Sequence, residues 1–232
     1  MEKYKILNKD SFALKLNKDL VFDAIITDPP YNISQKNNFR TMGRSGIDFG
    51  EWDKGFDVLG WIKLYYPNLK KGGSILIFNS FNNMGDICKE LERLGASVKD
   101  LIRWEKTNPM PKNIERRYVT DVEFCIWAVK PGKWTFNKGG EKYKRPFYTT
   151  AIVSGKEKLG HSTQKSLFLM KELIKTHTNE NDLIIDPFMG SGTTGDAALR
   201  LNRRFIGIEK DKDYFDMAER RLKGVENENT NK

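Results

Sequence analysis

The chain has 232 residues with 40 Lys and Arg against 31 Asp and Glu, so its formal net charge is +9. This length suits one large α/β domain, and the positive charge favours an acidic partner without identifying it. No apolar stretch approaches the roughly 20 residues of a membrane helix, and no signal-like region follows the charged N-terminus. We therefore expect a soluble cytoplasmic protein. Its two cysteines, Cys88 and Cys125, are far apart and predict no metal site.

Short apolar runs alternate with amphipathic stretches along the whole chain, which is typical of parallel strands joined by helices. The expected strands are residues 4–7, 22–27, 74–79, 98–104, 122–129, 182–185 and 205–208, and the expected helices are residues 56–69, 82–94, 163–177, 191–201 and 211–222. The predicted fold is α/β, with a single doubly wound, mostly parallel sheet and helices on both faces. One domain would span residues 1–225, followed by a polar, flexible tail over residues 226–232.

Three segments interrupt this alternation. Residues 32–54 are rich in glycine and poor in aliphatic residues, and residues 107–117 combine prolines with basic residues. A long irregular segment inside a compact domain is usually functional or disordered. Residues 130–158 mix Lys and Arg with aromatic residues, a composition suited to contacting phosphates and stacking on bases. An equally good interpretation of this third segment is a β-hairpin whose aromatic face packs on the domain.

The apolar run of residues 22–27 ends abruptly in Asp28-Pro29-Pro30-Tyr31. Because proline fixes φ and has no N–H to donate, the chain must leave the sheet here in a rigid, extended turn. The ligand crevice of open α/β sheets lies at the carboxyl ends of the strands, which is where this corner is expected. The alternative is a purely structural turn with a surface tyrosine.

The chemistry of this corner suits an amine. The carboxylate of Asp28 and a proline carbonyl are two acceptors that can hold the two N–H bonds of one small donor. The exocyclic amine of adenine is a poor nucleophile because its lone pair is delocalised into the ring. Two acceptors favour a pyramidal nitrogen with a free lone pair, and Tyr31 can stack on the base. The corner therefore indicates catalysis by positioning and electrostatics, without a covalent intermediate.

A second apolar run, residues 183–185, leads into the glycine-rich segment DPFMGSGTTG at residues 186–195. Its glycines allow close approach of the backbone to a ligand, and the following helix offers free amide donors. The next expected strand ends in Glu209, placed to accept hydrogen bonds from ribose hydroxyls. One interpretation of the glycine-rich segment is a binding site for a nicotinamide or flavin dinucleotide. Asp186 argues against it, because a carboxylate repels a pyrophosphate but attracts the ammonium or sulfonium of S-adenosylmethionine.

Taken together, the Asp28-Pro29-Pro30-Tyr31 corner and the glycine-rich segment resemble the β-group of amino-methyltransferases of restriction–modification systems. In that group the catalytic motif precedes the cofactor motif. The resemblance covers nearly the whole chain and implies a Rossmann-like methyltransferase fold with permuted motif order. It implies catalytic roles for Asp28, Pro29, Pro30 and Tyr31. It implies cofactor-binding roles for Asp10, His161, Thr163, Gln164, Lys165, Asp186, Phe188, Gly190, Ser191, Gly192, Thr193 and Glu209.

The sequence departs from the family pattern in a few places. The family segment His-Pro-Thr-Gln-Lys-Pro has serine at both proline positions here, Ser162 and Ser166, and Lys9 replaces a glycine before Asp10. Aspartate at position 28 resembles the adenine-N6 members more than the cytosine-N4 members. The resemblance thus implies a DNA adenine-N6 methyltransferase that uses S-adenosylmethionine, requires no metal, acts on double-stranded DNA, flips the target base and is compatible with a homodimer.

The alternatives are a cytosine-N4 methyltransferase, an RNA methyltransferase, an inactive nucleic-acid-binding module on the same fold, and a dehydrogenase using the glycine-rich segment. The family's target-recognition region corresponds to residues 130–160, which is short. Few residues are then available to read base edges, so we expect a short recognition sequence or relaxed specificity, with help from residues 32–54.

Overall fold

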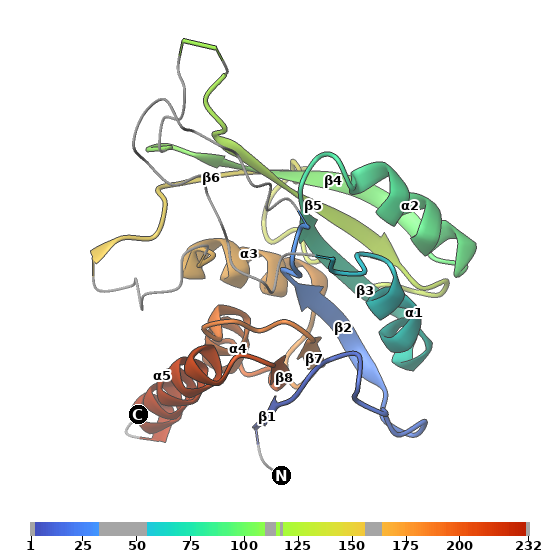
Figure 1. Ribbon diagram of the computed structural model, residues 1–232, viewed down its shortest axis with the longest axis vertical. Helices are drawn as coiled ribbons and strands as arrows, with labels where there is room; N and C mark the ends of the chain where they lie inside the picture. The colour runs from blue at the N-terminus through green and yellow to red at the C-terminus, as the bar shows by residue number, and fades with distance from the viewer. Residues whose placement is uncertain (1–2, 33–54, 110–114, 117, 156–163, 231–232) are drawn as a thin grey trace.

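A computed structural model of the chain describes residues 3–32, 55–109, 115–116, 118–155 and 164–230 (Figure 1). The strands are β1 (Tyr4–Asn8), β2 (Phe22–Thr27), β3 (Leu69–Asn79), β4 (Ser97–Lys106), β5 (Val122–Val129), β6 (Phe147–Thr150), β7 (Leu183–Asp186) and β8 (Arg204–Glu209). The helices are α1 (Gly60–Tyr65), the 3-10 helix η2 (Tyr66–Asn68), α2 (Met84–Arg93), α3 (Leu167–His177), α4 (Thr193–Arg200) and α5 (Lys212–Thr230).

The strands form one sheet in the order β1-β8-β7-β2-β3-β5-β4-β6. Neighbouring strands from β1 to β3 are parallel, β5 runs antiparallel to both β3 and β4, and β6 is parallel to β4. The predicted single, mostly parallel sheet is confirmed. No helix in the described part of the chain is long and apolar enough to cross a membrane.

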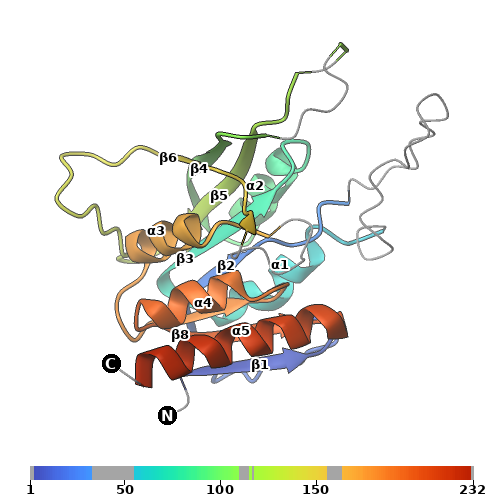
Figure 2. The same ribbon diagram turned by 90° about the vertical axis from the view of Figure 1, so that its left-hand side faces the viewer.

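Helices cover both faces of the sheet, with α1 and α2 on one side and α3, α4 and α5 on the other (Figures 1 and 2). The alternation of side chains along each strand divides the apolar residues between two cores. In β2, for example, Ala24 and Ile26 belong to the core beneath α3, α4 and α5, whereas Ile25 between them belongs to the core beneath α1 and α2. Because both faces are covered, the central strands read as continuous apolar runs.

The first expected helix, residues 56–69, is shorter in the structure. Only Gly60–Tyr65 is α-helical, and Tyr66–Asn68 continues it as a 3-10 turn containing Pro67. Proline removes an N–H donor and disfavours continued α-helix, so the chain extends from Leu69 into β3. The ends of this element were therefore predicted wrongly, although its existence was not.

The segment from Glu226, expected to be a flexible tail, is helical through Thr230. Val225 is buried against the core, and Arg200 of α4 pairs with Glu228 at 2.6 Å. These tertiary contacts extend α5 beyond the end that its polar sequence suggested.

The aromatic segment after β5 forms no hairpin among its described residues. Instead β6 pairs in parallel with β4 at the sheet edge. Phe136 stacks on Trp127 with ring centroids 5.2 Å apart. Trp134, Tyr143 and Phe147 remain 41%, 62% and 41% exposed. Only part of the aromatic set therefore packs on the domain, and the rest is available to a partner.

Candidate active site

The carboxyl ends of β2, β7 and β8 lie side by side in the sheet and end at Thr27, Asp186 and Glu209. β3 and β4 end at the same edge, where antiparallel β5 begins, since Asn79 pairs with Phe124 and Trp104 with Glu123. This edge is where ligands bind in doubly wound sheets. The two corners singled out in the sequence are thus neighbours in space.

Asp28 follows β2 directly, and both of its carboxylate oxygens have partners. The Tyr31 hydroxyl donates a hydrogen bond of 2.6 Å to Oδ1, and the Lys165 ammonium contacts Oδ2. The side chain of Asp28 is 23% exposed, so it is sheltered but reachable. Asp28, Tyr31 and Lys165 therefore form one cluster at the carboxyl ends of the parallel strands.

The cluster continues to a second carboxylate. Lys165 Nζ lies 3.2 Å from Glu123 of β5, and Glu123 in turn pairs with Lys106 of β4 at 2.5 Å. The ammonium of Lys165 also lies 5.7 Å from the ring centroid of Tyr31 and 5.3 Å from that of Phe78. Two acidic and two basic side chains alternate along this chain of contacts, so their formal charges cancel.

Burial and neighbouring charges oppose each other in this cluster. Burial raises the pKa of Asp28, and the ammonium of Lys165 partly offsets that rise. Burial works against the charged form of Lys165, but the carboxylates of Asp28 and Glu123 outweigh it and raise its pKa. The pKa of Glu123 is lowered, because Lys165 and Lys106 outweigh its desolvation. Lys165 therefore stays charged at neutral pH.

The peptide carrying Tyr31 is fixed by Asn83, the residue that precedes α2. The Asn83 side chain donates to the Tyr31 carbonyl at 2.8 Å and to Oδ1 of Asn79 at 2.7 Å. Asn79 is buried at the end of β3. This asparagine pair anchors the turn that contains Asp28 to the sheet.

Asp186, at the end of β7, is buried among three donors. Its carboxylate accepts hydrogen bonds from Thr27 at 2.6 Å, from Thr194 at 2.7 Å and from the Phe188 amide at 3.1 Å. Burial raises the pKa of Asp186 to about 6 despite these bonds. Asp186 is thus mostly ionised at neutral pH, but its pKa lies only slightly below that pH.

The glycine-rich segment is closed onto Glu209. The amides of Gly190 and Asp211 donate to its two carboxylate oxygens at 2.9 and 2.8 Å. Gly192 precedes α4 with φ +78°, and a Cβ there would lie 3.0 Å from that of Ala218. Glycine is therefore required at position 192 both by its backbone conformation and by the close approach of α5.

A buried arginine of α5, Arg221, binds the glycine-rich segment from the side of the helices. Arg221 pairs with Asp196 at 2.8 Å and donates to the Thr193 hydroxyl at 2.8 Å and to the Ser191 carbonyl at 3.3 Å. Its side chain is 7% exposed and that of Asp196 is 6% exposed. The loop conformation is thus tied to the packing of α4 against α5.

Aromatic rings border the other side of this corner. Phe188 packs edge-on against Phe56 and Trp61, with centroid distances of 5.3 and 5.5 Å. Asp10 lies beyond the end of β1, where Lys210 pairs with it at 2.9 Å and holds its pKa low. The arrangement places an apolar surface beside two carboxylates, which suits a nucleoside.

Comparison with known proteins agrees with this geometry. The family model described as DNA methylase, of the N6/N4 type, matches residues 22–220. The chain belongs to this family. It is 36% identical over 240 residues to the type II methyltransferase M2.LlaDCHI of Lactococcus lactis subsp. cremoris, covering 94% of this chain and 88% of that protein. It is 36% identical over 246 residues to M2.DpnII of Streptococcus pneumoniae, with 96% and 90% covered.

Two solved structures are similar over nearly the whole chain. The complex of M1.HpyAVI with S-adenosylmethionine has a TM-score of 0.78 and 46% identity, covering 94% of this chain and 98% of that one. The cytosine-N4-specific PvuII DNA methyltransferase has a TM-score of 0.71 at 17% identity, covering 97% and 91%. This second likeness is one of fold alone.

The structure of this methylase groups most of the predicted site residues. Asp28, Pro29, Pro30 and Tyr31 form the corner after β2, while Asp186, Phe188, Gly190, Ser191, Gly192, Thr193 and Glu209 form the adjacent one. Lys165, expected to bind the cofactor, has its ammonium on Asp28, and Gln164 is buried next to it in the chain. His161 and Thr163 lie outside the described residues.

Several residues at the site were not found from the sequence. Glu123 is the main example, together with Asn79, Asn83 and Thr194. A signal for Glu123 did exist, because it is the only charged residue in the otherwise apolar strand β5. A charge in such a strand needs a partner, and Lys165 and Lys106 supply it here.

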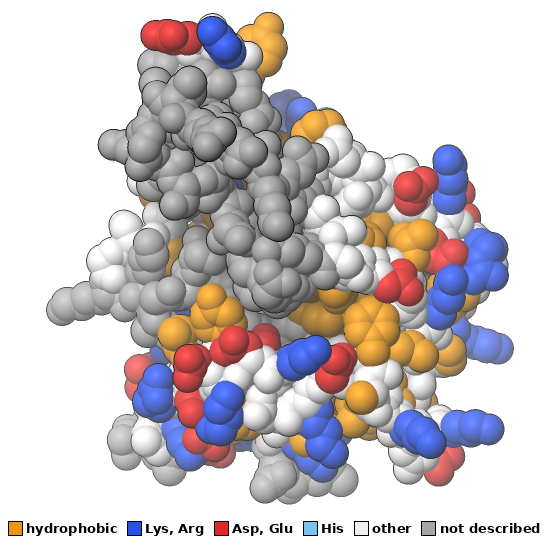
Figure 3. All heavy atoms as spheres, viewed as in Figure 1, with side chains coloured by type: hydrophobic (Ala, Val, Ile, Leu, Met, Phe, Trp, Pro, Cys, Tyr) orange, Lys and Arg blue, Asp and Glu red, His pale blue; other side chains and the backbone are white. Residues whose placement is uncertain are grey.

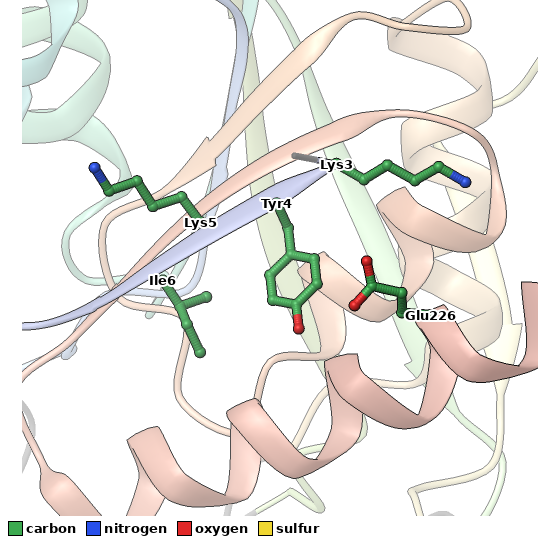
Figure 4. Close-up of a pocket in the computed structure, with 5 residues that line it drawn as sticks. All are labelled: Lys3, Tyr4, Lys5, Ile6 and Glu226. Atoms are coloured by element: carbon green, nitrogen blue, oxygen red, sulfur yellow. The ribbon is translucent and has the colours of Figure 1, made fainter. Parts of the chain in front are cut away.

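A pocket away from this edge carries no site residue. Tyr4 and Ile6 of β1 point toward α5 there, whereas Lys5 points to the other side (Figure 4). It lies at the start of β1, opposite the edge where Glu209 and Asp28 are found. Among the residues that the structure describes, no group of three or more His, Cys, Asp or Glu side chains is arranged for a metal ion.

Proposed function

We propose that this methylase transfers a methyl group from S-adenosylmethionine to the N6 amine of an adenine flipped out of double-stranded DNA. The observation that carries the proposal is the 2.6 Å hydrogen bond from Thr27 to Asp186. It joins the strand that leads into Asp28 to the start of the glycine-rich corner. An amine held at Asp28 is therefore close to a donor held in that corner, as direct transfer requires.

The residues of the second corner fit S-adenosylmethionine. Glu209 suits the ribose hydroxyls, since each of its oxygens keeps a lone pair besides the one used by a backbone amide. Asp186 supplies negative charge for the ammonium of the methionine moiety, and the ring of Phe188 suits the adenine. The cofactor, when bound, supplies a methyl group on a positively charged sulfur.

Asp28 and Tyr31 then act on the base. The carboxylate of Asp28 accepts an N–H of the exocyclic amine and so frees the nitrogen lone pair, while the Tyr31 ring stacks on the base and holds it. Transfer forms the N–CH3 bond as the S–CH3 bond breaks, which releases S-adenosylhomocysteine and leaves a positive charge on the nitrogen. The same carboxylate stabilises that charge until the nitrogen releases one proton to water.

Aspartate at position 28 supports adenine as the target rather than cytosine, because it matches the adenine-N6 type of the family motif. Cytosine-N4 methylation is the second candidate. The two products are different modified nucleosides, so one measurement separates them.

The region around β6 supports binding to DNA. Arg103 lies 5.3 Å from the ring centroid of Phe147, and Arg145 lies 5.8 Å from that of Tyr143, and both rings are largely exposed. Cations beside exposed rings suit a surface that meets phosphates and unstacked bases. On the face shown in Figure 3, by contrast, basic and acidic side chains are mixed. The segment 130–160 therefore remains the proposed target-recognition region, reading a short sequence.

The decisive experiment incubates the protein with labelled S-adenosylmethionine and, in separate reactions, duplex DNA, RNA and no acceptor. We expect label in duplex DNA and N6-methyladenine after digestion to nucleosides. N4-methylcytosine would support the second candidate, and label only in RNA would overturn the proposal. Sequencing the methylated DNA tests the short recognition sequence, which one long, strictly required site would contradict.

Replacement of Asp28 tests the assigned role. Asp28→Ala should retain cofactor binding and lose transfer. Asp100→Ala is the matched control, because Asp100 is exposed on β4 and its carboxylate accepts a hydrogen bond from the neighbouring Leu101 amide. Methylation by the Asp28→Ala protein would show that another group holds the amine.

A homodimer is a separate proposal drawn from the family resemblance. Sedimentation of the protein alone and with duplex DNA tests it. A monomer under both conditions would contradict it.

A further inference from the structure

The ammonium of Lys165 has three N–H donors, and three oxygen atoms of the site lie near it. These are Asp28 Oδ2, Glu123 Oε2 at 3.2 Å and the Tyr31 hydroxyl at 3.5 Å. Its side chain is only 6% exposed. The ammonium is thus directed into the catalytic corner, where it hydrogen-bonds Asp28 and Tyr31 and forms an ion pair with Glu123.

The start of α3 fixes the direction of this side chain. Ser166, the N-cap residue, accepts a hydrogen bond from the Leu169 amide at 3.5 Å, and Gln164, Lys165 and Ser166 are all buried. Serine stands here where the family segment has proline. A capped helix start places Lys165 at a set distance from β2 and β5.

We propose that Lys165, held by Glu123, is a positioning residue that keeps the carboxylate of Asp28 ionised and oriented toward the target amine. This inference rests on the proposed role of Asp28. It assigns Lys165 to the catalytic corner instead of the cofactor site that the resemblance implied.

The charges around Asp28 explain why a cation is needed. Glu123, Asp186, Tyr31 and Cys125 all approach it, and none of them carries positive charge. Without Lys165, two sheltered carboxylates would face each other, and one would take up a proton. Glu123 would still have Lys106 at 2.5 Å, so Asp28 would be the one protonated. A protonated carboxyl loses the acceptor strength that the amine requires.

The test compares the pH dependence of kcat for the wild type, Lys165→Met, Lys165→Arg and Glu123→Gln. Lys165→Met should move the acidic limb of the profile upward by about one pH unit or more, which is about a tenfold loss of rate on that limb for each unit. The KM for S-adenosylmethionine should stay unchanged. Lys165→Arg should restore much of the rate because it keeps the charge.

Glu123→Gln should move the same limb in the opposite direction. Its carboxylate raises the pKa of Asp28, so removing that charge leaves Lys165 to Asp28 alone. Opposite displacements from two neighbouring substitutions are not expected of residues that merely support the fold. Lys70→Met is the control, since Lys70 pairs with Asp23 and Asp182 at the other end of the strands.

A second readout does not depend on methyl transfer. Titration of the ¹³C-labelled Asp28 carboxyl in the full chain, assigned with Asp28→Asn, should show a higher pKa in Lys165→Met than in the wild type. If the wild type methylates no DNA, the proposed function fails while this titration still decides the role of Lys165. An unchanged titration, or a rate lost equally at every pH, would overturn the inference. If Lys165→Met does not fold, Glu123→Gln still tests the inference, because its acidic limb must move downward, and an unmoved limb would overturn it.

Discussion

Thr27, the last residue of β2, donates a hydrogen bond of 2.6 Å to Asp186, the last residue of β7. This bond connects the strand before the proposed catalytic corner, residues 28–31, with the strand before the proposed cofactor corner, residues 186–195. It also helps to keep Asp186 charged, because burial raises the pKa of that carboxyl and the Thr27 hydroxyl lowers it again. A side chain that touches no substrate therefore influences the charge of the proposed cofactor site.

Thr27→Val removes this hydroxyl at nearly constant volume. We expect the pKa of Asp186 to rise above about 6, so that less of the carboxylate is charged at neutral pH. Affinity for S-adenosylmethionine should then fall several-fold, and the loss should grow as the pH is lowered. Calorimetric titrations across neutrality check this, with Thr27→Ser as the control that keeps the hydroxyl. Equal affinities for the Val and Ser proteins would contradict it.

Ionised Asp186 should also lower the free energy of unfolding of the cofactor-free protein. Its folded pKa of about 6 lies above the ordinary value of 3.8, so the folded state binds the proton more tightly than the unfolded state. The free energy of unfolding should therefore fall as pH rises from 3.8 to about 6, by on the order of 3 kcal/mol at 1.36 kcal/mol per unit.

Asp186→Asn removes this penalty. We expect the free energy of unfolding at neutral pH to increase by about 1–2 kcal/mol, less than the full penalty because an amide is a weaker acceptor for the two threonines. Binding of S-adenosylmethionine should be lost. Urea denaturation on both sides of the Asp186 pKa measures the effect. A variant less stable than the wild type at neutral pH would argue against a strained carboxylate.

The strands with a clear apolar run in the sequence were predicted well. Strands β2 and β7 are buried, so their apolar runs mark them clearly, and Asp28 and Asp186 stand as the polar residues at their ends. The apolar part of β3, residues 74–79, was found for the same reason, whereas its start at Leu69 was missed because the sequence there is polar. Local rules suffice there, because a strand end and a proline turn are decided by neighbouring residues.

The contact between Lys165 and Asp28 could not be predicted in this way. The two residues are 137 positions apart, and only the order of strands in the sheet brings them together. Burial of Val225 against the core likewise extends α5 through a segment that is polar in sequence. Tertiary packing, which no local pattern contains, decides both features.

Tyr31→Phe separates the two roles of Tyr31. The ring is kept, but the 2.6 Å hydrogen bond to Asp28 is lost. A bond of this kind contributes about 1 kcal/mol, so the single-turnover rate should fall roughly five- to tenfold. Tyr31→Ala should reduce it much further because stacking on the base is lost as well. If the Phe protein is as slow as the Ala protein, the hydroxyl rather than the ring is the essential group.

Arg221 and Arg200 offer a matched pair for testing the glycine-rich loop. Both bind the carboxylate of Asp196, at 2.8 and 2.6 Å. Arg221 also bonds Thr193 and the Ser191 carbonyl, whereas Arg200 pairs with Glu228 of α5. Arg221→Met breaks a buried pair, which typically costs about 3–5 kcal/mol, and Arg200 offsets part of that loss.

The two substitutions should therefore differ in their effect on the cofactor. Arg221→Met should weaken binding of S-adenosylmethionine about tenfold or more, since loss of two loop contacts at about 1 kcal/mol each releases the amides around Gly190. Arg200→Met should lower stability with little change in affinity. Calorimetry at a temperature where both variants are folded measures the difference. Equal affinities would mean that the loop keeps its conformation through Glu209 and Gly192 alone, without support from α5.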